Sequence, residues 1–337
     1  MFPLQRQGTL MGVVAYVIWG LSAIYWRLLV QVPAMQLLCH RIVWALPVAA
    51  VVAVATGHGP TTRSCVSFQA TTVVFYIVTA TLLGINLCVS IVAANAGFIV
   101  ELSLGYFTSP LVTVLLGVVM LRERLRRWQW VAIAMATSGL LTVTFLYGKF
   151  PWISIVLAAN FGVYGLMQKK APLVSVQGIC IEFAILTVPS AVYLIYEHRR
   201  GTAAFMSLYP GYDILLVGLG VLTVTPQLLF STAIKRIPLT TMGLLQFIGP
   251  TLNILTGVVI YNEDFQWTKA IGFAQVWLGL VIYAIDLVRY GAKPASAPTD
   301  AVAATDRPTI ARAADVDEAL ELTESDAAST AKPTAKM

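Results

Sequence analysis

Charged side chains are scarce in this chain. They make up 11% of its 337 residues, less than half of the roughly 25% that soluble domains carry. Histidine occurs three times and cysteine four times, and the cysteines have neither the spacing of metal ligands nor that of a disulfide framework. The low charge argues against a soluble globular protein. The sequence also predicts no metal site and no cofactor.

Long apolar stretches take the place of charge, and hydrophobic residues make up 58% of the chain. Ten stretches have the ~17–25 residues that a helix needs to cross a bilayer. They lie at about residues 8–28, 35–56, 70–94, 102–121, 128–147, 151–168, 175–196, 213–233, 240–261 and 267–287. The connections are too short for a soluble catalytic domain. The sequence therefore predicts an all-α membrane protein with ten transmembrane helices embedded in a lipid bilayer.

The charges divide the chain into two parts. Residues 1–293 contain 18 Lys and Arg against 8 Asp and Glu, whereas residues 294–337 contain 4 against 8. The second part is rich in Ala, Thr, Ser and Pro and poor in large apolar residues, which is typical of disorder. We therefore predict a disordered tail at residues 291–337. The basic excess of the first part is typical of cytoplasmic loops and does not indicate nucleic-acid binding.

The positions of Lys and Arg in the connections predict the orientation of the chain. With the N-terminus inside the cell, twelve of these residues fall in cytoplasmic segments and five in outer segments. Cytoplasmic loops of membrane proteins carry the excess of positive charge. Both termini are therefore predicted to be cytoplasmic, which would place the tail in the cytoplasm.

The sequence repeats itself with an offset of about 140 residues. At an offset of 140 the aligned identical pairs include Pro110 and Pro250, Gly117 and Gly257, Glu123 and Glu263, and Gly139 and Gly279. The front halves align at an offset of 142, which places His40 against Glu182. We therefore predict two five-helix halves, residues 1–147 and 148–290. Because five is odd, the second half is inverted in the membrane, an arrangement typical of secondary transporters.

Charge and proline recur at corresponding positions of the two halves. The fourth span is followed by "RERLRR" and its counterpart, the ninth, by "NEDFQW", as expected for segments on opposite sides of the membrane. Pro110 and Pro250 each free the carbonyl group four residues earlier, at Tyr106 and Gln246. Either neighbouring helices satisfy these carbonyls at two kinks, or two broken helices line a cavity at the midplane.

Several short motifs point to a known family. They are "AYVIWG" (15–20), "HRIVW" (40–44), "ELSLGYF" (101–107), "LRERLRRWQW" (121–130), "YGLMQKKAP" (164–172), "TPQLLF" (225–230) and "PLTTMGLLQFIGPTLN" (238–253). With these motifs the chain resembles the EamA-type transporters of the drug/metabolite transporter superfamily over about residues 8–288. Within that group it is most similar to the RarD branch, whose members are often named chloramphenicol-sensitive proteins.

The resemblance implies ten transmembrane helices in two inverted halves and alternating access through a central cavity. It also implies movement of a small organic solute across the plasma membrane. The chain departs from the pattern of the branch at Leu87, Val92, Ser109 and Phe247. The resemblance therefore does not identify the substrate.

Three ionisable residues are predicted to lie well inside spans: His40, Arg41 and Glu182. A charge near the bilayer centre costs about 2.5–3.5 kcal/mol, so such groups should face protein or water. At 1.5 Å per residue, Arg41 lies about 10 Å from the outer end of its span and Glu182 about as far from the inner end of its own. Each is then about 5 Å from the middle of a ~30 Å hydrocarbon core. We expect both within reach of one cavity.

Each of these residues has a structural and a functional interpretation. Glu182 either pairs with Arg41 or a backbone group, or it contacts substrate or binds a coupling proton. His40 either joins two helices by a hydrogen bond or contributes to the site. Arg41 either anchors helices or recognises an anionic or polar substrate. All three are candidate substrate-binding residues, and proton coupling stays open.

Neutral polar residues complete the candidate substrate-binding set. Gln246 and Asn253 are seven residues apart and therefore share a helical face beside Pro250. Tyr106 is the corresponding candidate in the first half. Interhelical hydrogen bonds explain most polar residues inside spans, so the position beside a helix break is what singles these residues out.

Secondary transport of a small-molecule solute, either a metabolite or a drug, is the predicted function. An intramembrane enzyme would need a Ser–His pair, a metal cluster or two facing aspartates inside the spans. Two of the three histidines, His58 and His198, fall in loops, so the spans lack these catalytic groups. No enzymatic activity is therefore predicted. The alternative is a non-transporting membrane receptor or assembly protein that acts through its tail. Residues 8–12, "GTLMG", have the small-xxx-small pattern, which leaves a homodimer open.

Overall fold

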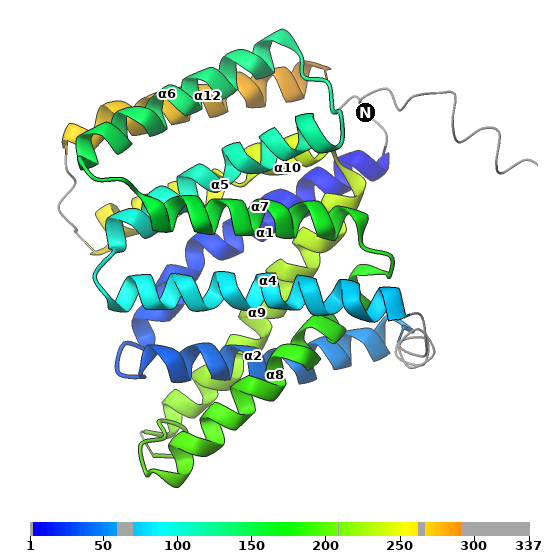
Figure 1. Cartoon of the computed structure of the whole chain (residues 1–337), viewed down its shortest axis with the longest axis vertical. Coiled ribbons are helices and arrows are strands. Elements are labelled where there is room, and N and C mark those ends of the chain that lie inside the picture. Colours follow the sequence, from blue (N-terminus) through cyan, green and yellow to red (C-terminus); the bar gives the residue numbers. More distant parts are fainter. Residues whose placement is uncertain (1–2, 59–69, 208, 262–266, 291–337) are drawn as a thin grey trace, which may run out of the picture. The chain divides into compact units, whose positions relative to one another are not determined.

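A computed structural model describes residues 3–58, 70–207, 209–261 and 267–290 of the chain. In these residues every regular element is a helix (Figure 1). The helices are α1 (Pro3–Leu28), α2 (Ala34–Ala55), α4 (Ala70–Asn95), α5 (Ile99–Met120), α6 (Arg127–Tyr147), α7 (Trp152–Lys170), α8 (Ser175–Arg199), α9 (Pro210–Arg236), α10 (Leu239–Leu245), α11 (Ile248–Leu255), the π-helical turn η1 (Thr256–Ile260) and α12 (Trp267–Tyr290). The predicted tail, residues 291–337, and Glu263 lie outside the described residues.

The ten predicted spans correspond to these helices, with α10, α11 and η1 together forming the ninth. Within the described residues, nine helices are long and apolar enough to cross a membrane when residues 239–260 are counted as one. The predicted span outside this set is α7, which has 19 residues and contains Asn160, Gln168 and two lysines. It packs against α4, α5 and α9, and a helix covered by other helices need not be apolar on every face. The predicted fold class is confirmed.

Large apolar side chains are exposed on several helices. Phe145 of α6 and Val288 of α12 keep 80% and 86% of their surfaces exposed, and Val51 of α2 and Val188 of α8 are also exposed. In water such side chains would favour aggregation. In a bilayer these side chains contact lipid tails, as expected for an integral membrane protein.

Helices α6 and α12 occupy corresponding positions in the two halves, and they pack side by side in opposite directions (Figure 1). Arg126, immediately before α6, forms an ion pair with Asp286 near the end of α12. Farther along the pair, Gly139 lies against the backbone of Gly272, near the beginning of α12. The start of one helix therefore meets the end of the other. This antiparallel contact is what an inverted repeat requires of its corresponding helices.

Two further pairs of corresponding helices also run antiparallel. The Gln36 side chain, at the start of α2, donates to the carbonyl oxygen of Thr202 (2.8 Å) and accepts from the backbone N–H of Ala204 (2.7 Å), both beyond the end of α8. Gly117, near the end of α5, lies against Thr240 at the start of α10. Helices α2 and α8, like α5 and α10, therefore cross the bundle in opposite directions.

Contacts between non-corresponding helices repeat as well. Gly20 of α1 lies against Leu252 of α11, and Gly162 of α7 lies against Val112 of α5. The two glycines are 142 positions apart and their two partners 140 positions apart, the same offsets as in the sequence repeat. The two five-helix halves are thus arranged as inverted copies. We call the side at which α1 begins the N-side and the opposite side the far side.

The two prolines of the repeat have different effects on their helices. The ninth span is interrupted at Gln246 and Phe247, between α10 and α11, four residues before Pro250. There the carbonyl oxygen of Gln246 accepts a 3.3 Å hydrogen bond from the backbone N–H of Gly249. By contrast, α5 continues through Pro110 as one helix. Gln246 and Phe247 keep right-handed helical backbone angles, so the ninth span turns more tightly ahead of Pro250, whereas α5 shows no such turn at Pro110.

Pro110 is closely packed and has hydroxyl groups nearby in α5. Gly243 of α10 lies so close to the Pro110 carbonyl oxygen that a Cβ atom on it would be 2.9 Å away. Ser109 and Thr113 donate hydrogen bonds of 2.8 and 2.9 Å to carbonyl oxygens one turn earlier in α5. A neighbouring helix and nearby hydroxyl groups are the usual means by which membrane helices accommodate proline.

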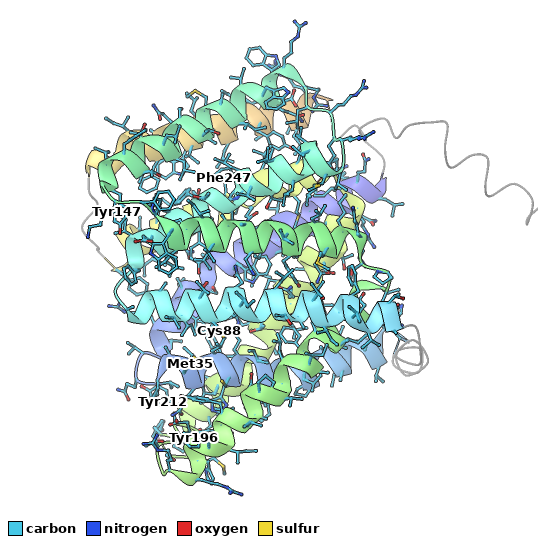
Figure 2. All side chains as sticks on the ribbon, viewed as in Figure 1. Met35, Cys88, Tyr147, Tyr196, Tyr212 and Phe247 are labelled. Carbon is cyan, nitrogen blue, oxygen red and sulfur yellow. The ribbon has the colours of Figure 1, made fainter. Side chains whose placement is uncertain are left out.

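A second packed layer joins α5 to the α6–α12 pair. Phe247, at the break of the ninth span, points between these helices (Figure 2) and is almost fully buried. Its ring centre lies 6.4 Å from that of Phe107, which lies 5.2 Å from that of Phe273. Aromatic packing therefore fixes the interrupted point of the ninth span against its counterpart helix.

Candidate functional site

A fully buried carboxyl group lies near the N-side end of α8. Glu182 accepts hydrogen bonds from the Tyr164 hydroxyl (3.0 Å) and the Gln168 amide (2.8 Å), both on α7. These two donors are four residues apart and therefore on one face of their helix. Thr79 of α4 is a further hydrogen-bond partner of Glu182. The carboxyl group thus joins α4, α7 and α8.

Helix α9 completes the same network. Ser231 donates a 3.0 Å hydrogen bond to the Gln168 amide oxygen, and the Gln227 amide donates to the Tyr164 hydroxyl. We call Tyr164, Gln168, Glu182, Gln227 and Ser231 the Glu182 cluster. All five are buried.

The described residues supply no direct cationic partner for Glu182. The nearby Lys235 interacts with it electrostatically, but the Lys235 Nζ donates a 2.5 Å hydrogen bond to the Leu173 carbonyl oxygen. Lys169 donates to the carbonyl oxygens of Ile234 (3.0 Å) and Ile237 (2.6 Å) at the end of α9. Lys169 therefore binds carbonyl groups left free at the end of α9, and Lys235 binds a carbonyl group in the connection between α7 and α8.

Aromatic rings cover one side of the Glu182 cluster. The Tyr164 ring stacks on Phe230 with centres 6.3 Å apart and planes 9° apart. Phe230 also lies 5.6 Å from Trp19 and 5.7 Å from Phe161. These rings exclude water from the Tyr164 side of the cluster, which strengthens its hydrogen bonds.

A second polar group lies nearer the far side, around Arg41 of α2. The Arg41 Nε donates a 3.0 Å hydrogen bond to the hydroxyl of Thr223 on α9. The guanidinium carbon lies 5.3 Å from the centre of the Trp26 ring on α1. Arg41 also interacts electrostatically with Tyr106 of α5, and Tyr106 is hydrogen-bonded to Ser90 of α4. We call Trp26, Arg41, Ser90, Tyr106 and Thr223 the arginine site.

The arginine site unites two predicted residues, Arg41 and Tyr106, and adds three that the sequence did not single out. Among the described residues Arg41 and Glu182 form no ion pair, so the interpretation in which Glu182 pairs with Arg41 does not hold. Each lies seven residues after the start of its helix, Arg41 from the far side and Glu182 from the N-side. They approach the middle of the bundle from opposite ends, and each has its own hydrogen-bond partners.

Gln246 lies at the helix break and faces α5. Its amide oxygen accepts a 3.3 Å hydrogen bond from the hydroxyl of Thr113, and both side chains are buried. The structure therefore places Gln246 beside the proline-containing stretch of its counterpart helix. Asn253 is half-buried on α11, beyond Pro250.

His40 faces away from Arg41, although the two are adjacent in sequence. Its ring lies 5.3 Å from Phe205 in the connection between α8 and α9, and it interacts electrostatically with Asp213 at the start of α9. The His40 Nδ1 atom is buried without a hydrogen bond. The structure thus separates His40 from the other predicted site residues.

Sequence reasoning missed Tyr164, Gln168 and Ser231. A signal was present for the first two, because Tyr164 and Gln168 have helical i,i+4 spacing within the motif "YGLMQKKAP". Ser231 carries no signal of its own, since hydroxyl residues are common in spans and usually bond within their own helix. Its place in the Glu182 cluster depends on how α9 packs against α7.

Metal binding has no obvious location in the described part of the chain. No group of three or more His, Cys, Asp or Glu side chains gathers there in a way that could hold a metal ion. The groups available at the two polar sites are a guanidinium, one carboxyl, hydroxyls and amides. These groups can bind and orient a polar solute.

Comparisons with known proteins agree with this architecture. Residues 6–145 match the EamA-like transporter family. The chain is 38% identical over 288 residues to a Vibrio cholerae protein named "Uncharacterized transporter", covering 85% of this chain and 94% of that protein. It is 35% identical over 284 residues to "Protein RarD" of Escherichia coli K12, covering 84% and 95%. It is 30% identical over 286 residues to "Chloramphenicol-sensitive protein RarD" of Pseudomonas aeruginosa, covering 84% and 95%.

The fold is also similar to that of a solved structure. A crystal structure superposes on the chain with a TM-score of 0.63, covering 82% of this chain and 97% of the other. The two sequences are 19% identical. At this identity the similarity supports the fold alone.

Proposed function

The chain belongs to the EamA-like transporter family, and we propose that it is an alternating-access secondary transporter. In this proposal it moves a small organic solute across the plasma membrane, and both termini lie in the cytoplasm. The chain aligns with 95% of the length of each RarD relative, so the proposal concerns the whole bundle. The proposal assigns no enzymatic activity.

The antiparallel packing of corresponding helices carries the proposal. Arg126 and Asp286 join α6 and α12 at the N-side, while Gln36 joins α2 to the end of α8 at the far side. Alternating access needs two similar bundles whose contacts can be exchanged between the two sides. Inverted copies with matching contacts provide such bundles.

The solute path in this proposal passes Arg41, Tyr106 and Gln246. Arg41 and Tyr106 belong to the arginine site, and Gln246 lies at the interruption of the ninth span. A helix interruption is tolerated inside a membrane where protein or a water-filled cavity satisfies the backbone. We assign Asn253 to the same path, because it follows Gln246 by two helical turns. His40 is assigned to packing.

Flux through proteoliposomes tests this function. Purified full-length protein would be reconstituted and offered a panel of small organic solutes, and accumulation above protein-free vesicles is expected for at least one of them. Gln246→Ala should lower that flux several-fold, because the variant removes a polar group at the helix break. Gln275→Ala, which changes a glutamine on α12 away from the two polar sites, should leave it unchanged.

A negative result would favour a different class of protein. Absence of flux for every solute, with correctly folded protein, would favour a receptor or assembly role. Deleting residues 291–337 would then test the tail as the partner-binding segment. Unchanged flux in Gln246→Ala would remove Gln246 from the path.

The orientation can be tested independently by chemical labelling. Single cysteines at Arg124 and Lys149 would be introduced into a background in which all four native cysteines are replaced. These positions lie in connections at opposite ends of α6, and both are exposed. A membrane-impermeant thiol reagent added to intact cells should label the Lys149 position only. Labelling at Arg124 instead would reverse the proposed orientation.

Glu182 has a structural role in this proposal, and a proton is not assigned to it. Its donors are the Tyr164 hydroxyl, the Gln168 amide and Thr79. Each of these groups supports a carboxylate that acts only as an acceptor. The cluster therefore holds α7, α8 and α9 together at the N-side, and Thr79 adds α4.

A further inference from the structure

Arg41 differs from Lys169, Lys235 and Arg126 in how its hydrogen-bond donors are used. Lys169 and Lys235 donate to backbone carbonyl oxygens, and Arg126 pairs with Asp286 at 2.5 Å. Among the described residues, Arg41 makes one side-chain hydrogen bond, from Nε to Thr223. The two terminal nitrogens, Nη1 and Nη2, are left without an acceptor in that part of the chain.

Part of the Arg41 side chain is exposed. Arg41 is half-buried, and its nitrogens are absent from the set of buried polar atoms that lack a partner. The guanidinium group remains charged at any physiological pH, and a charge this deep in a bilayer costs about 2.5–3.5 kcal/mol. Arg41 is thus a permanent cation with two donors that have no acceptor among the described residues, and a ligand could complete their hydrogen bonds.

No carboxylate of the described residues neutralises Arg41. Its electrostatic neighbour is the Tyr106 hydroxyl, while Asp213 interacts with His40 on another side of α2. Glu182 is enclosed by its own donors. The arginine site consequently has a net positive charge that calls for an anion.

Tyr106 is the most exposed side chain named for the arginine site. Tyr106 is 40% exposed, yet it shares a face of α5 with Pro110 and Thr113, at i, i+4 and i+7. Those two residues are buried against α10. Tyr106 and the Trp26 ring both lie next to Arg41.

We propose that the arginine site binds the carboxylate of a small organic anion with an apolar or aromatic body. The two carboxylate oxygens accept one hydrogen bond each from Nη1 and Nη2, the bidentate geometry in which arginine binds carboxylates most strongly. Thr223 holds Nε and so fixes the direction of the fork. Trp26 and Tyr106 contact the body of the solute. This inference rests on the proposed transport function and names its substrate class.

Ligand-induced stabilisation of the purified full-length protein tests this site directly. The probes are sodium benzoate and sodium phenylacetate, with benzamide as the neutral analogue of the same size and sodium chloride at equal ionic strength as the salt control. Both carboxylates should raise the melting temperature of the wild type in a saturable manner. Benzamide and chloride should not, because neither presents two negatively charged oxygens to the guanidinium fork.

Three variants locate the binding site. Arg41→Gln should abolish the stabilisation. Arg41→Lys should raise the benzoate concentration needed for half-saturation by roughly tenfold, because lysine keeps the charge but loses the two parallel donors of the guanidinium. Arg200→Gln is the matched control: Arg200 also lies over an aromatic ring, that of Tyr196 at 5.4 Å, but at the exposed end of α8. It should bind benzoate as the wild type does. The wild-type comparison of benzoate with benzamide needs no variant and so does not depend on how Arg41→Gln folds.

The outcomes separate this inference from the proposed function. Equal stabilisation by benzamide, no stabilisation by either carboxylate, or unchanged benzoate binding in Arg41→Gln would each overturn the carboxylate site. Flux of a solute without a carboxyl group, unaffected by Arg41→Gln, would retain the transporter and remove the substrate class. Arg41-dependent benzoate binding without flux of any solute would retain the site and remove the transport function.

Discussion

Gly279 of α12 lies against the carbonyl oxygen of Ala132 of α6, so closely that a Cβ atom on it would be 2.6 Å from that oxygen. The repeat-related glycine, Gly139 of α6, makes the equivalent approach to Gly272 of α12. The same contact thus occurs twice, once from each half. The absence of a side chain at both glycines lets the two backbones come together, as small residues do in membrane helix pairs.

Replacing Gly279 by alanine should destabilise the protein. The added methyl group would meet backbone, which cannot move aside without shifting a helix, and overpacking of this kind costs about 1–3 kcal/mol. The measurement is the melting temperature of purified protein in detergent. Gly165→Ala on α7 is the matched control, because its nearest neighbour would be the Ile234 Cδ1 at 3.5 Å, an ordinary contact. Equal losses in the two variants would contradict the proposed role of close backbone approach.

Glu123 should be needed for the N-terminus of α10. Its two oxygens accept hydrogen bonds from the backbone N–H groups of Leu239 (2.7 Å) and Thr240 (2.8 Å), which have no partners inside their own helix. Glu123→Ala removes both acceptors and should cost about 0.5–2 kcal/mol, the range of helix-capping losses. Hydrogen exchange should become faster at residues 239–241. The neighbouring, exposed Arg124→Ala should leave exchange there unchanged, and protection retained in Glu123→Ala would refute the capping role.

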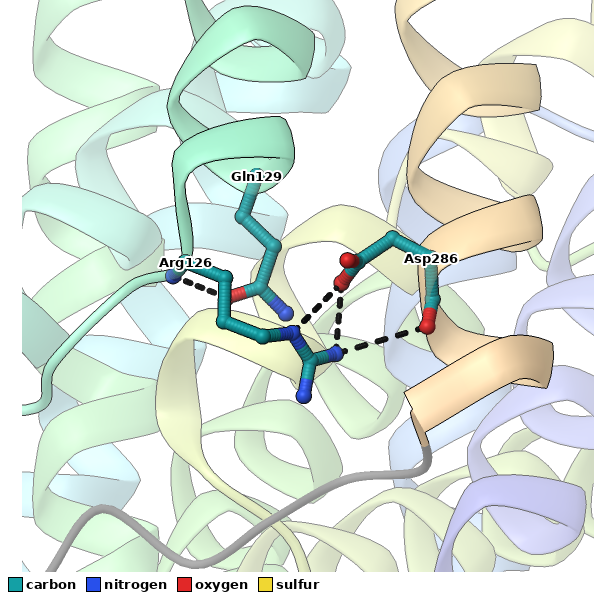
Figure 3. Close-up of polar contacts among 3 residues, drawn as sticks. All are labelled: Arg126, Gln129 and Asp286. Atoms are coloured by element: carbon teal, nitrogen blue, oxygen red, sulfur yellow. Dashed lines mark hydrogen bonds and ion pairs between the residues drawn. The ribbon is translucent and has the colours of Figure 1, made fainter.

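The Arg126–Asp286 pair should show an asymmetric response to mutation. Arg126 donates to the Asp286 carboxylate from Nε at 2.9 Å and from Nη2 at 2.5 Å, and its backbone N–H is held by Gln129 (Figure 3). The side chain of Asp286 is 2% exposed and that of Arg126 is 27% exposed. If Asp286 is lost, water can solvate the partly exposed Arg126 side chain. If Arg126 is lost, the buried Asp286 carboxylate is solvated less well and stays unpaired.

Arg126→Met should therefore lower the melting temperature more than Asp286→Leu. The double variant should be less destabilised than the sum of the two single variants, with a coupling energy within the 0.5–3 kcal/mol, roughly, that contacting residues show. Thermal unfolding of the four proteins provides the cycle. Additive effects, or a larger loss in Asp286→Leu, would show that the pair contributes little beyond its separate side chains.

Glu182→Gln should destabilise the bundle without changing the response of transport to a pH gradient. The new amide presents an NH2 group where the carboxylate accepted from Tyr164 and Gln168, and an unsatisfied buried donor costs about 1–3 kcal/mol. Melting temperature measures the first effect, and flux with and without an imposed pH gradient measures the second. A gradient-driven wild-type flux that disappears in a folded Glu182→Gln variant would reassign Glu182 to proton coupling.

The structure shows which parts of the candidate site a sequence can reveal. Arg41 was predicted from its charge and its depth in a span, and Tyr106 as the first-half counterpart of Gln246. Both clues are visible in a single sequence. Trp26, Ser90 and Thr223 could not be predicted as their neighbours. They come from helices α1, α4 and α9, and their proximity depends on packing between segments that are far apart in the chain.

His40 and Glu182 illustrate the same limit from the other side. Both were singled out because an ionisable group inside a span needs a partner. The sequence does not say on which side of the helix that partner lies. His40 comes one residue before Arg41 but lies on a different face of α2, where it contacts Phe205. Glu182 instead accepts hydrogen bonds from donors on α4 and α7.

By itself, the sequence determined the number of spans, the all-helical fold and the inverted relation of the two halves. The length of the apolar runs, their hydropathy and the internal repeat can all be read directly from the sequence. In a bilayer, such runs form helices because a helix satisfies its own backbone hydrogen bonds. Only the tertiary structure decided that the ninth span is interrupted ahead of Pro250 while α5 continues through Pro110. It also decided that Glu182 accepts hydrogen bonds from neighbouring side chains, while the terminal nitrogens of Arg41 have no acceptor among the described residues. Those outcomes depend on which neighbouring helix supplies a partner at each point, and that is set by packing in three dimensions.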